Sequence, residues 1–166
     1  MRNLIAIPLL GFAVVVQTAI AGQITLLSGI VDIVLVMLAA WALQERVSTA
    51  FHWAFFAGLL ASLVSRLPWF VYFTSYLGTV LLALLLQRRI WQVPMLAMFS
   101  VTFLGTILLH AASLGYLGLS GVSFSLADAL GLVTLPSVLL NLLIAIPIFG
   151  LMRDVARWVF GYAEAA

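Results

Sequence analysis

Side chains that could carry chemistry are scarce in the hydrophobic segments of this sequence. Asp32 is the one acidic residue inside such a segment, and His52 and His110 lie in two other segments. A single carboxylate has no second acid with which to share general acid–base work. The spacing of these three residues does not match that of a metal-ligand set, and the chain has no cysteine. We therefore expect no enzyme activity, no metal and no cofactor.

Asp32 and Asn141 are strongly polar side chains within apolar segments. A charged or amide group surrounded by lipid is costly, so each is a functional candidate. Asp32 is compatible with two roles: a carboxylate that joins helices, or a group that handles a proton or a substrate. Asn141 is expected to hydrogen-bond to another helix, either of this chain or of a partner protein. Gln17 and Thr18 could play the same part in the first segment.

Two prolines flank Asn141 in its segment. Pro136 and Pro147 lack a backbone N–H, so each frees a carbonyl oxygen that needs another partner. Interrupted helices line binding sites in transporters. Prolines are also ordinary in membrane helices, and the sequence leaves both interpretations open.

Small residues recur in the segment 50–64. Ala57 and Ala61, like Gly58 and Ser62, are four residues apart and so lie on one face of a helix. Small residues at this spacing let two helix backbones approach closely. This helix is therefore expected to pack tightly, either within the chain or against a partner.

Composition predicts the elements that hold these residues. Hydrophobic residues make up 66% of the 166-residue chain and charged residues 7%, too few for the surface of a soluble domain. The apolar segments are continuous and lack the alternation of a membrane β-barrel. We predict an all-α integral membrane protein with one domain, residues 1–166, and six spanning helices. The predicted spans are Leu4–Ala21, Ile24–Leu43, Ala50–Val64, Trp69–Leu86, Val93–Leu114 and Leu130–Met152, with a Gly/Ser-rich loop at 115–128.

The seven basic residues are all arginines, and their placement predicts the orientation. With the N-terminus inside and six spans, Arg66 is the one arginine outside the cell. This count is an excess of arginines on the cytoplasmic side, as is typical of short loops there. If any one span were removed, the arginines after it would fall on the opposite side and the excess would disappear. We therefore predict that both termini are cytoplasmic. The arginines on the cytoplasmic side are Arg2, Arg46, Arg88, Arg89, Arg153 and Arg157.

Both ends of the chain carry a further pattern. The first segment ends in Ala19-Ile20-Ala21 and resembles a signal peptide. Its apolar run is longer than the ~7–15 residues usual for such a peptide, so we expect a retained helix. Residues 153–166 are expected to form a short interfacial tail. Five arginines would contact lipid or a cytoplasmic protein on that side: Arg46, Arg88, Arg89, Arg153 and Arg157.

Over its full length the chain resembles the MreD family of bacterial rod-shape-determining membrane proteins. Val31-Asp32-Ile33 is similar to the Pro-Asp-Leu element of that family, and Ala57-Gly58-Leu59-Leu60 resembles its Gly-Leu-rich third helix. The chain departs from the family at Val31, which replaces the proline, and at Ser62 and Ser65, where an acidic residue is common. Further similar stretches are Arg46, Tyr76-Leu77-Gly78 with Arg88-Arg89, and Leu140-Asn141-Leu142 with Pro147, Leu151 and Arg153.

The resemblance implies a non-enzymatic scaffold of the cell-wall elongation complex in the bacterial cytoplasmic membrane. Such a protein would bind the membrane helix of MreC. It would link MreB filaments to the peptidoglycan synthase RodA and its class B penicillin-binding protein, and a homodimer is left open. The residues expected to contact the partner are Asp32, Ala57, Gly58, Ala61 and Asn141.

The fold that the resemblance implies is similar to that of S-components, the substrate-binding subunits of energy-coupling-factor vitamin transporters. This likeness supplies the alternative function, the binding of a vitamin. A small-molecule pocket needs several convergent polar groups. The outer halves of the predicted helices offer mainly Asp32, His110 and a few hydroxyl groups, so the sequence favours the scaffold.

Overall fold

The structure is a computed structural model that describes residues 6–21, 23, 26–44, 47, 49–87 and 93–160. Four of the predicted cytoplasmic arginines, Arg2, Arg46, Arg88 and Arg89, lie outside these residues. Within the described residues the secondary structure is helical, apart from one isolated antiparallel bridge between Leu26 and Gly29. The all-α prediction is confirmed for this part of the chain.

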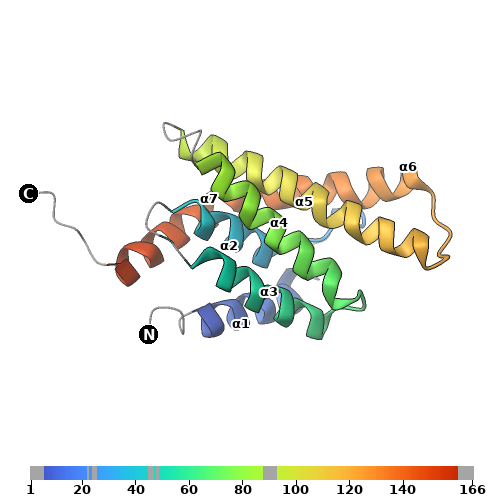
Figure 1. Cartoon of the computed structure of the whole chain (residues 1–166). Helices are drawn as coiled ribbons and strands as arrows, with labels where there is room; N and C mark the ends of the chain where they lie inside the picture. The colour runs from blue at the N-terminus through green and yellow to red at the C-terminus, as the bar shows by residue number, and fades with distance from the viewer. Residues whose placement is uncertain are drawn as a thin grey trace, which may run out of the picture.

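Six helical rods make up the described fold. The first is α1 (Ala6–Val16), which continues into the π-helical turn η2 (Gln17–Ala21). The last runs from α6 (Leu126–Asp128) through the π-helical η3 (Ala129–Thr134) into α7 (Leu135–Phe160). α1 begins and α7 ends at the same end of the bundle (Figure 1). The rods between them are α2 (Ile33–Ala42), α3 (Ala50–Val64), α4 (Trp69–Gln87) and α5 (Pro94–Leu119).

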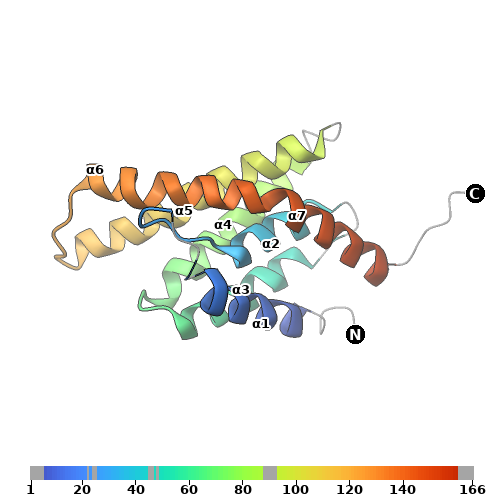
Figure 2. The ribbon, with the colours of Figure 1, turned by 180° about the vertical axis from the view of Figure 1, so that it is seen from behind.

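The shortest rod, α2, lies at the centre of the bundle. It contacts α3, α4, α5 and α7, and its residues from Val34 to Ala42 are all buried. α4 and α5 cover it on one side (Figure 1) and α7 on the other (Figure 2). A helix of this length spans about 15 Å, roughly half of the hydrocarbon core of a bilayer. The interior is therefore built around a helix that cannot cross a membrane alone.

Among the described residues, three helices are long and apolar enough to cross a membrane: Trp69–Gln87, Pro94–Leu119 and Leu126–Phe160. Three further helices are apolar but shorter: Ala6–Ala19, Ile33–Ala42 and Ala50–Val64. The long apolar helices agree with the prediction of a helical membrane protein.

The predicted span Ile24–Leu43 is wrong in its first half. The helix begins at Ile33, and residues 26–32 are not helical. Composition did not reveal this break because most of these residues are as apolar as the helix that follows. Asp32 therefore lies at the start of a helix and not inside one.

The predicted loop at 115–128 is shorter in the structure. α5 extends to Leu119 and the last rod begins at Leu126, so that part of the glycine-rich stretch is helical. Tyr116 packs edge-on against Phe70 of α4, with ring centroids 5.8 Å apart, and this contact supports the last turns of α5. The resulting hairpin projects beyond the other helices (Figure 1). At the other end α7 continues to Phe160, so residues 153–160 of the predicted tail extend that helix.

Candidate functional site

Residues 26–32, which we call the docked segment, lie along the last helical rod (Figure 2). Every second N–H of an extended chain faces the same way, and here three alternate N–H groups face that rod. Three N–H groups, at every second residue from Ser28 to Asp32, thus bond to the rod. Ser28 N donates to the carbonyl oxygen of Leu132 (3.0 Å), Ile30 N to Oγ of Ser137 (2.9 Å), and Asp32 N to Oδ1 of Asn141 (2.8 Å).

Helix geometry explains why these acceptors are free. Leu132 lies in the π-helical η3, and the residue four positions on, which would be the donor in an α-helix, is Pro136, which has no N–H. That carbonyl is therefore available to Ser28. Ser137 and Asn141 are four residues apart and share one face of α7, so their side chains continue the row. We call this set of three hydrogen bonds the polar seam.

The docked segment comes closest to α7 at Gly29. A Cβ atom at this position would lie 2.6 Å from Cβ of Pro136 and 2.7 Å from the backbone nitrogen of Ser137. Any larger residue would push the segment away, so the close approach requires glycine. The preceding turn is strained, because Leu27 has a φ of 55°, which a branched side chain rarely adopts.

Asp32 caps the buried start of α2. Its Oδ1 accepts a hydrogen bond from the backbone N–H of Leu35 (2.9 Å), the usual geometry of an N-cap. The hydroxyl of Tyr76, on α4, lies 3.2 and 3.1 Å from the two oxygens of the same carboxylate and donates to it. The backbone N–H of Val34 donates to Oε1 of Gln17, in η2 (3.1 Å). The carboxylate also lies where the helix dipole is positive, which favours it there.

Asn141 connects this cap to α5. Its Nδ2 donates to Oγ1 of Thr106 (3.0 Å), and the Thr106 hydroxyl donates in turn to the carbonyl of Thr102 (2.8 Å). Asp32 is 8% exposed and Asn141 is 1% exposed, so the network is shielded from the surroundings of the protein. Together these bonds join η2, α2, α4, α5 and α7.

The structure therefore shows that Asp32 and Asn141 join helices of this chain to one another through hydrogen bonds. The other roles considered for Asp32, the handling of a proton or a substrate, stay a prediction. The N-terminus of a helix can bind an anion, but at α2 the N–H groups of Asp32, Val34 and Leu35 already have acceptors in the chain. The side chain of Gln17 accepts a hydrogen bond from another helix, α2, as expected. The hydroxyl of Thr18 instead donates to the Val14 carbonyl of its own helix (3.0 Å).

The two histidines lie apart from this network. Nδ1 of His110 is 3.2 Å from Oγ1 of Thr134, a contact between α5 and η3. His52 is exposed on α3. The structure does not bring these two residues and Asp32 together.

Ala57, Gly58 and Ala61 lie in the packing between α3 and the rest of the chain. All three are buried. A Cβ atom at Gly58 would lie 3.0 Å from Cα of Phe73, so this glycine lets α3 and α4 pack closely. Of the two roles that the sequence left open, internal packing is shown, and contact with a partner stays a prediction.

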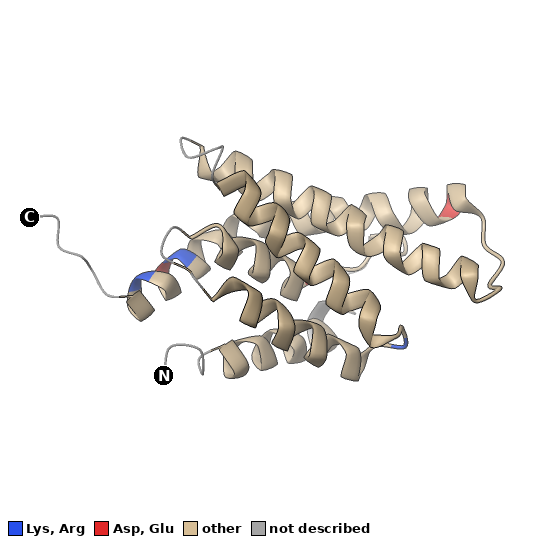
Figure 3. Ribbon diagram, in the orientation of Figure 1, with Lys and Arg blue, Asp and Glu red and all other residues tan. Residues whose placement is uncertain are grey.

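The described arginines lie at opposite ends of the bundle (Figure 3). Arg153 and Arg157 are exposed near the end of α7, with Asp154 at 3.9 and 3.6 Å from their guanidinium nitrogens. Arg66 is exposed in the turn between α3 and α4. The predicted contact of Arg153 and Arg157 with lipid or a cytoplasmic protein stays a prediction.

Described residues of neighbouring helices form two apolar grooves on the outer surface of the bundle. The α5–α7 groove has a volume of about 590 Å³ and is lined by Phe99, Ser100, Phe103, Leu104 and Leu142. The α3–α4 groove has a volume of about 210 Å³ and is lined by Phe55, Gly58, Leu59, Trp69 and Phe73. Walls of this composition suit hydrocarbon chains or apolar side chains.

Four members of the site were not identified as such from the sequence: Gly29, Tyr76, Thr106 and Ser137. Their residue types did not distinguish them in the sequence, because hydroxyl groups and glycines are common in membrane helices. The pair Ser28-Gly29 before Asp32 is a turn signal within an apolar run, and it could have shown the break in the predicted second span.

A comparison of the chain with protein-family models, with curated proteins and with solved structures finds no match in any of the three. The site is therefore defined by its own geometry. It is a buried hydrogen-bond network that holds an interrupted helix at the centre of a membrane protein, with apolar grooves on the outside.

Proposed function

We propose that this chain is a non-enzymatic membrane scaffold of the MreD type, part of the cell-wall elongation complex in the bacterial cytoplasmic membrane. It binds the single membrane helix of MreC and links MreB filaments to RodA and its class B penicillin-binding protein. It crosses the membrane six times, with both termini in the cytoplasm, in a fold like that of the S-components.

The observation that carries this proposal is the use of the buried polar groups. Asp32, Asn141 and Gln17 all hydrogen-bond to other parts of this chain. Satisfied buried networks of this kind rigidify a core. A rigid interior combined with an apolar outer surface is what a protein needs when it binds membrane helices of partners.

The positions of the described arginines support the orientation. Arg66 lies at one end of the bundle, and Arg153 and Arg157 lie at the other (Figure 3). The start of α1 lies at the same end as the latter pair (Figure 1). An odd number of crossings would place the start of α1 and the end of α7 on opposite sides, so the arrangement favours an even number.

We assign the partner helix to the α5–α7 groove. Membrane helices associate by van der Waals packing and through small residues that let backbones approach. Phe99, Phe103 and Leu142 give this groove bulky walls, and Ser100 is its one small residue. An apolar helix with a side chain inserted above Ser100 would fill it.

The runner-up function, vitamin binding, is favoured by one observation, the interruption before α2. In transporters, the N-termini of such broken helices point at anionic substrate groups. Here the carboxylate of Asp32 itself lies at the N-terminus of α2, where it accepts a hydrogen bond from Leu35 N, and Oδ1 of Asn141 accepts one from Asp32 N. A ligand would have to displace both, which weighs against this function.

The absence of cysteine makes a direct test possible, because single-cysteine variants can be cross-linked without background. Ser100→Cys and Leu59→Cys place one thiol in each of the two grooves. Each variant is co-expressed with an MreC-like protein that carries one cysteine in its membrane helix. We expect co-purification with both variants and a cross-link from Ser100→Cys alone.

Two results would contradict the proposal. One is a failure of the MreC-like protein to co-purify with the unaltered chain. The other is thermal stabilisation of the purified chain by one member of a vitamin panel, since a ligand that binds the folded state alone raises its stability. A cross-link from Leu59→Cys instead would leave the partner in place and move it to the α3–α4 groove.

A further inference from the structure

We propose that the α3–α4 groove, together with Arg66, binds one anionic phospholipid of the surrounding bilayer. Arg66 holds its phosphate and the groove holds one of its acyl chains. This inference is independent of the proposed function, because it concerns the lipid that the chain retains and not its protein partner.

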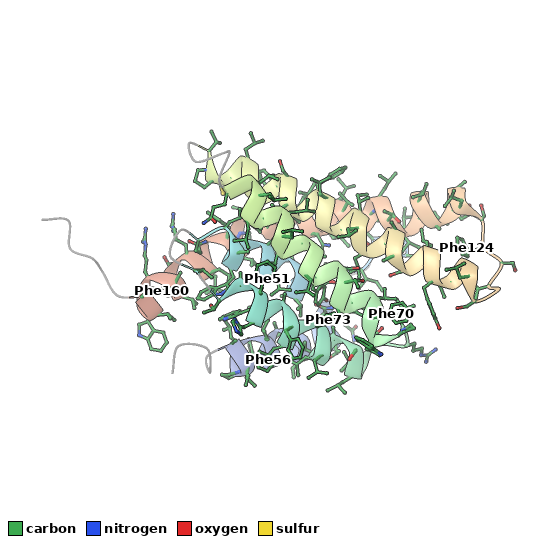
Figure 4. All side chains as sticks on the ribbon, viewed as in Figure 1. Phe51, Phe56, Phe70, Phe73, Phe124 and Phe160 are labelled. Atoms are coloured by element: carbon green, nitrogen blue, oxygen red, sulfur yellow. The ribbon has the colours of Figure 1, made fainter. Side chains whose placement is uncertain are left out.

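The groove is lined by apolar side chains and one glycine, a composition that suits an acyl chain. Aromatic rings form its walls: Phe55 packs edge-on against Phe73 at 5.5 Å, and Trp69 packs against Phe73 at 6.0 Å between ring centroids. Gly58 also lines the groove, and a Cβ atom there would lie 3.0 Å from Cα of Phe73. Phe73 is labelled in the region of α3 and α4 in Figure 4.

Arg66 supplies the charge that an anionic headgroup requires. It lies in the turn between α3 and α4 (Figure 3), three residues before Trp69. Its side chain is exposed, and it has no acidic partner among the described residues. The paired arginines at the other end, Arg153 and Arg157, differ from it in lying beside Asp154.

The order of these residues along the bundle matches the order of groups in a phospholipid. Arg66 is outermost, and Trp69, 64% exposed, follows at the start of α4, where tryptophan occupies the membrane interface. Phe73 is one helical turn further in, about 6 Å deeper at 1.5 Å per residue. A phosphate beside Arg66 would therefore place its acyl chain along the aromatic walls.

A lipid fits this groove better than a partner helix does. The groove is less than half the volume of the α5–α7 groove, and its α4 residues, Trp69 and Phe73, lie in the first turns after the turn that holds Arg66. A partner helix would need a longer apolar surface and would leave Arg66 without a counter-charge. Anionic lipid supplies both the narrow apolar chain and the charge.

The test uses the full chain, purified in mild detergent from bacterial membranes, with bound lipid measured by native mass spectrometry. Phosphatidylglycerol and phosphatidylcholine are then titrated as probes. We expect one retained phospholipid, and phosphatidylglycerol to bind more tightly than phosphatidylcholine. Arg66→Gln should weaken phosphatidylglycerol binding about fivefold, and Leu59→Trp, which fills the groove from an exposed position, should remove the retained lipid.

Matched controls are available at exposed positions elsewhere. Arg153→Gln removes an arginine at the opposite end, and Leu143→Trp enlarges an exposed leucine on α7. Both should retain the lipid as the unaltered chain does. The proposal is overturned if the unaltered chain retains no phospholipid, if the two probes bind equally, or if the controls lose lipid to the same degree as Arg66→Gln and Leu59→Trp.

Discussion

Two contacts in this protein each depend on a glycine, yet different forces hold them. At the polar seam, Gly29 lets the docked segment approach Pro136, and three hydrogen bonds join the segment to the last rod. At the α3–α4 contact, Gly58 lets α3 approach Phe73, and small side chains pack there. One contact is held by polar groups and the other by close packing.

The state of the backbone explains the difference. Helices satisfy their own N–H and carbonyl groups, so α3 and α4 need nothing but a close fit. The docked segment is not helical, and its N–H groups would otherwise be unpaired inside a membrane protein, at a cost of several kcal/mol each. Polar side chains are therefore concentrated where the helix is interrupted, and small ones where it is not.

The largest expected effect is that of Gly29→Ala. The added methyl group meets the backbone beside Pro136, so the segment must shift and all three bonds of the polar seam lengthen. We expect a loss of about 3 kcal/mol in the free energy of unfolding, measured by denaturant titration in detergent. Gly11→Ala is the matched control, because a Cβ there meets nothing within 4 Å. A loss of equal size at Gly11 would contradict the assignment.

Asp32 is expected to come next, and two substitutions separate its possible roles. Asp32→Ala removes the cap of α2 and the acceptor of Tyr76, which should lower the free energy of unfolding by about 2 kcal/mol. Asp32→Asn keeps a cap of equal quality and should lose less than about 1 kcal/mol. Thermal unfolding and MreC co-purification check both variants. If Asn impairs partner binding as much as Ala does, the carboxylate charge itself has a function.

Gly58→Ala tests the packed contact and should have a smaller effect. The new methyl group would lie 3.0 Å from Cα of Phe73, and a slight separation of α3 from α4 relieves this contact. We expect a loss of about 1 kcal/mol, measured by the same titration. The double variant with Gly29→Ala should show additive losses, because the two contacts share no residue. A strong departure from additivity would mean that the two contacts are coupled.

The smallest effect is expected for Pro136→Ala. This change gives residue 136 an N–H group, which competes with Ser28 for the Leu132 carbonyl. Stability should change by less than about 1 kcal/mol, while the Ser28 amide exchanges its hydrogen faster. Hydrogen exchange followed by mass spectrometry reports on this segment, and Pro147→Ala is the control. Unchanged exchange at Ser28 would show that the proline is not what frees the carbonyl.

Part of the site could be predicted from the sequence. Asp32 and Asn141 were selected because polar groups in apolar segments are rare, and Pro136 because it lacks an N–H. That Asn141 bonds to the Asp32 backbone could not be predicted, because these residues are far apart in the chain and nothing local fixes which helix faces which. The break before α2 was missed for a related reason, since its stabilising partners all lie on other elements.

The sequence by itself determined that the described chain is helical and apolar, and it located both ends of α3 and α4 to within one residue. Long runs of apolar residues have little choice of secondary structure, since only a helix satisfies its own backbone in lipid. The tertiary structure alone decided the central feature. Residues 26–32 leave the helix because the last rod offers them a free carbonyl in η3 and a hydroxyl and an amide in α7, and because Gly29 fits against Pro136. Those acceptors come within reach only when the chain is folded.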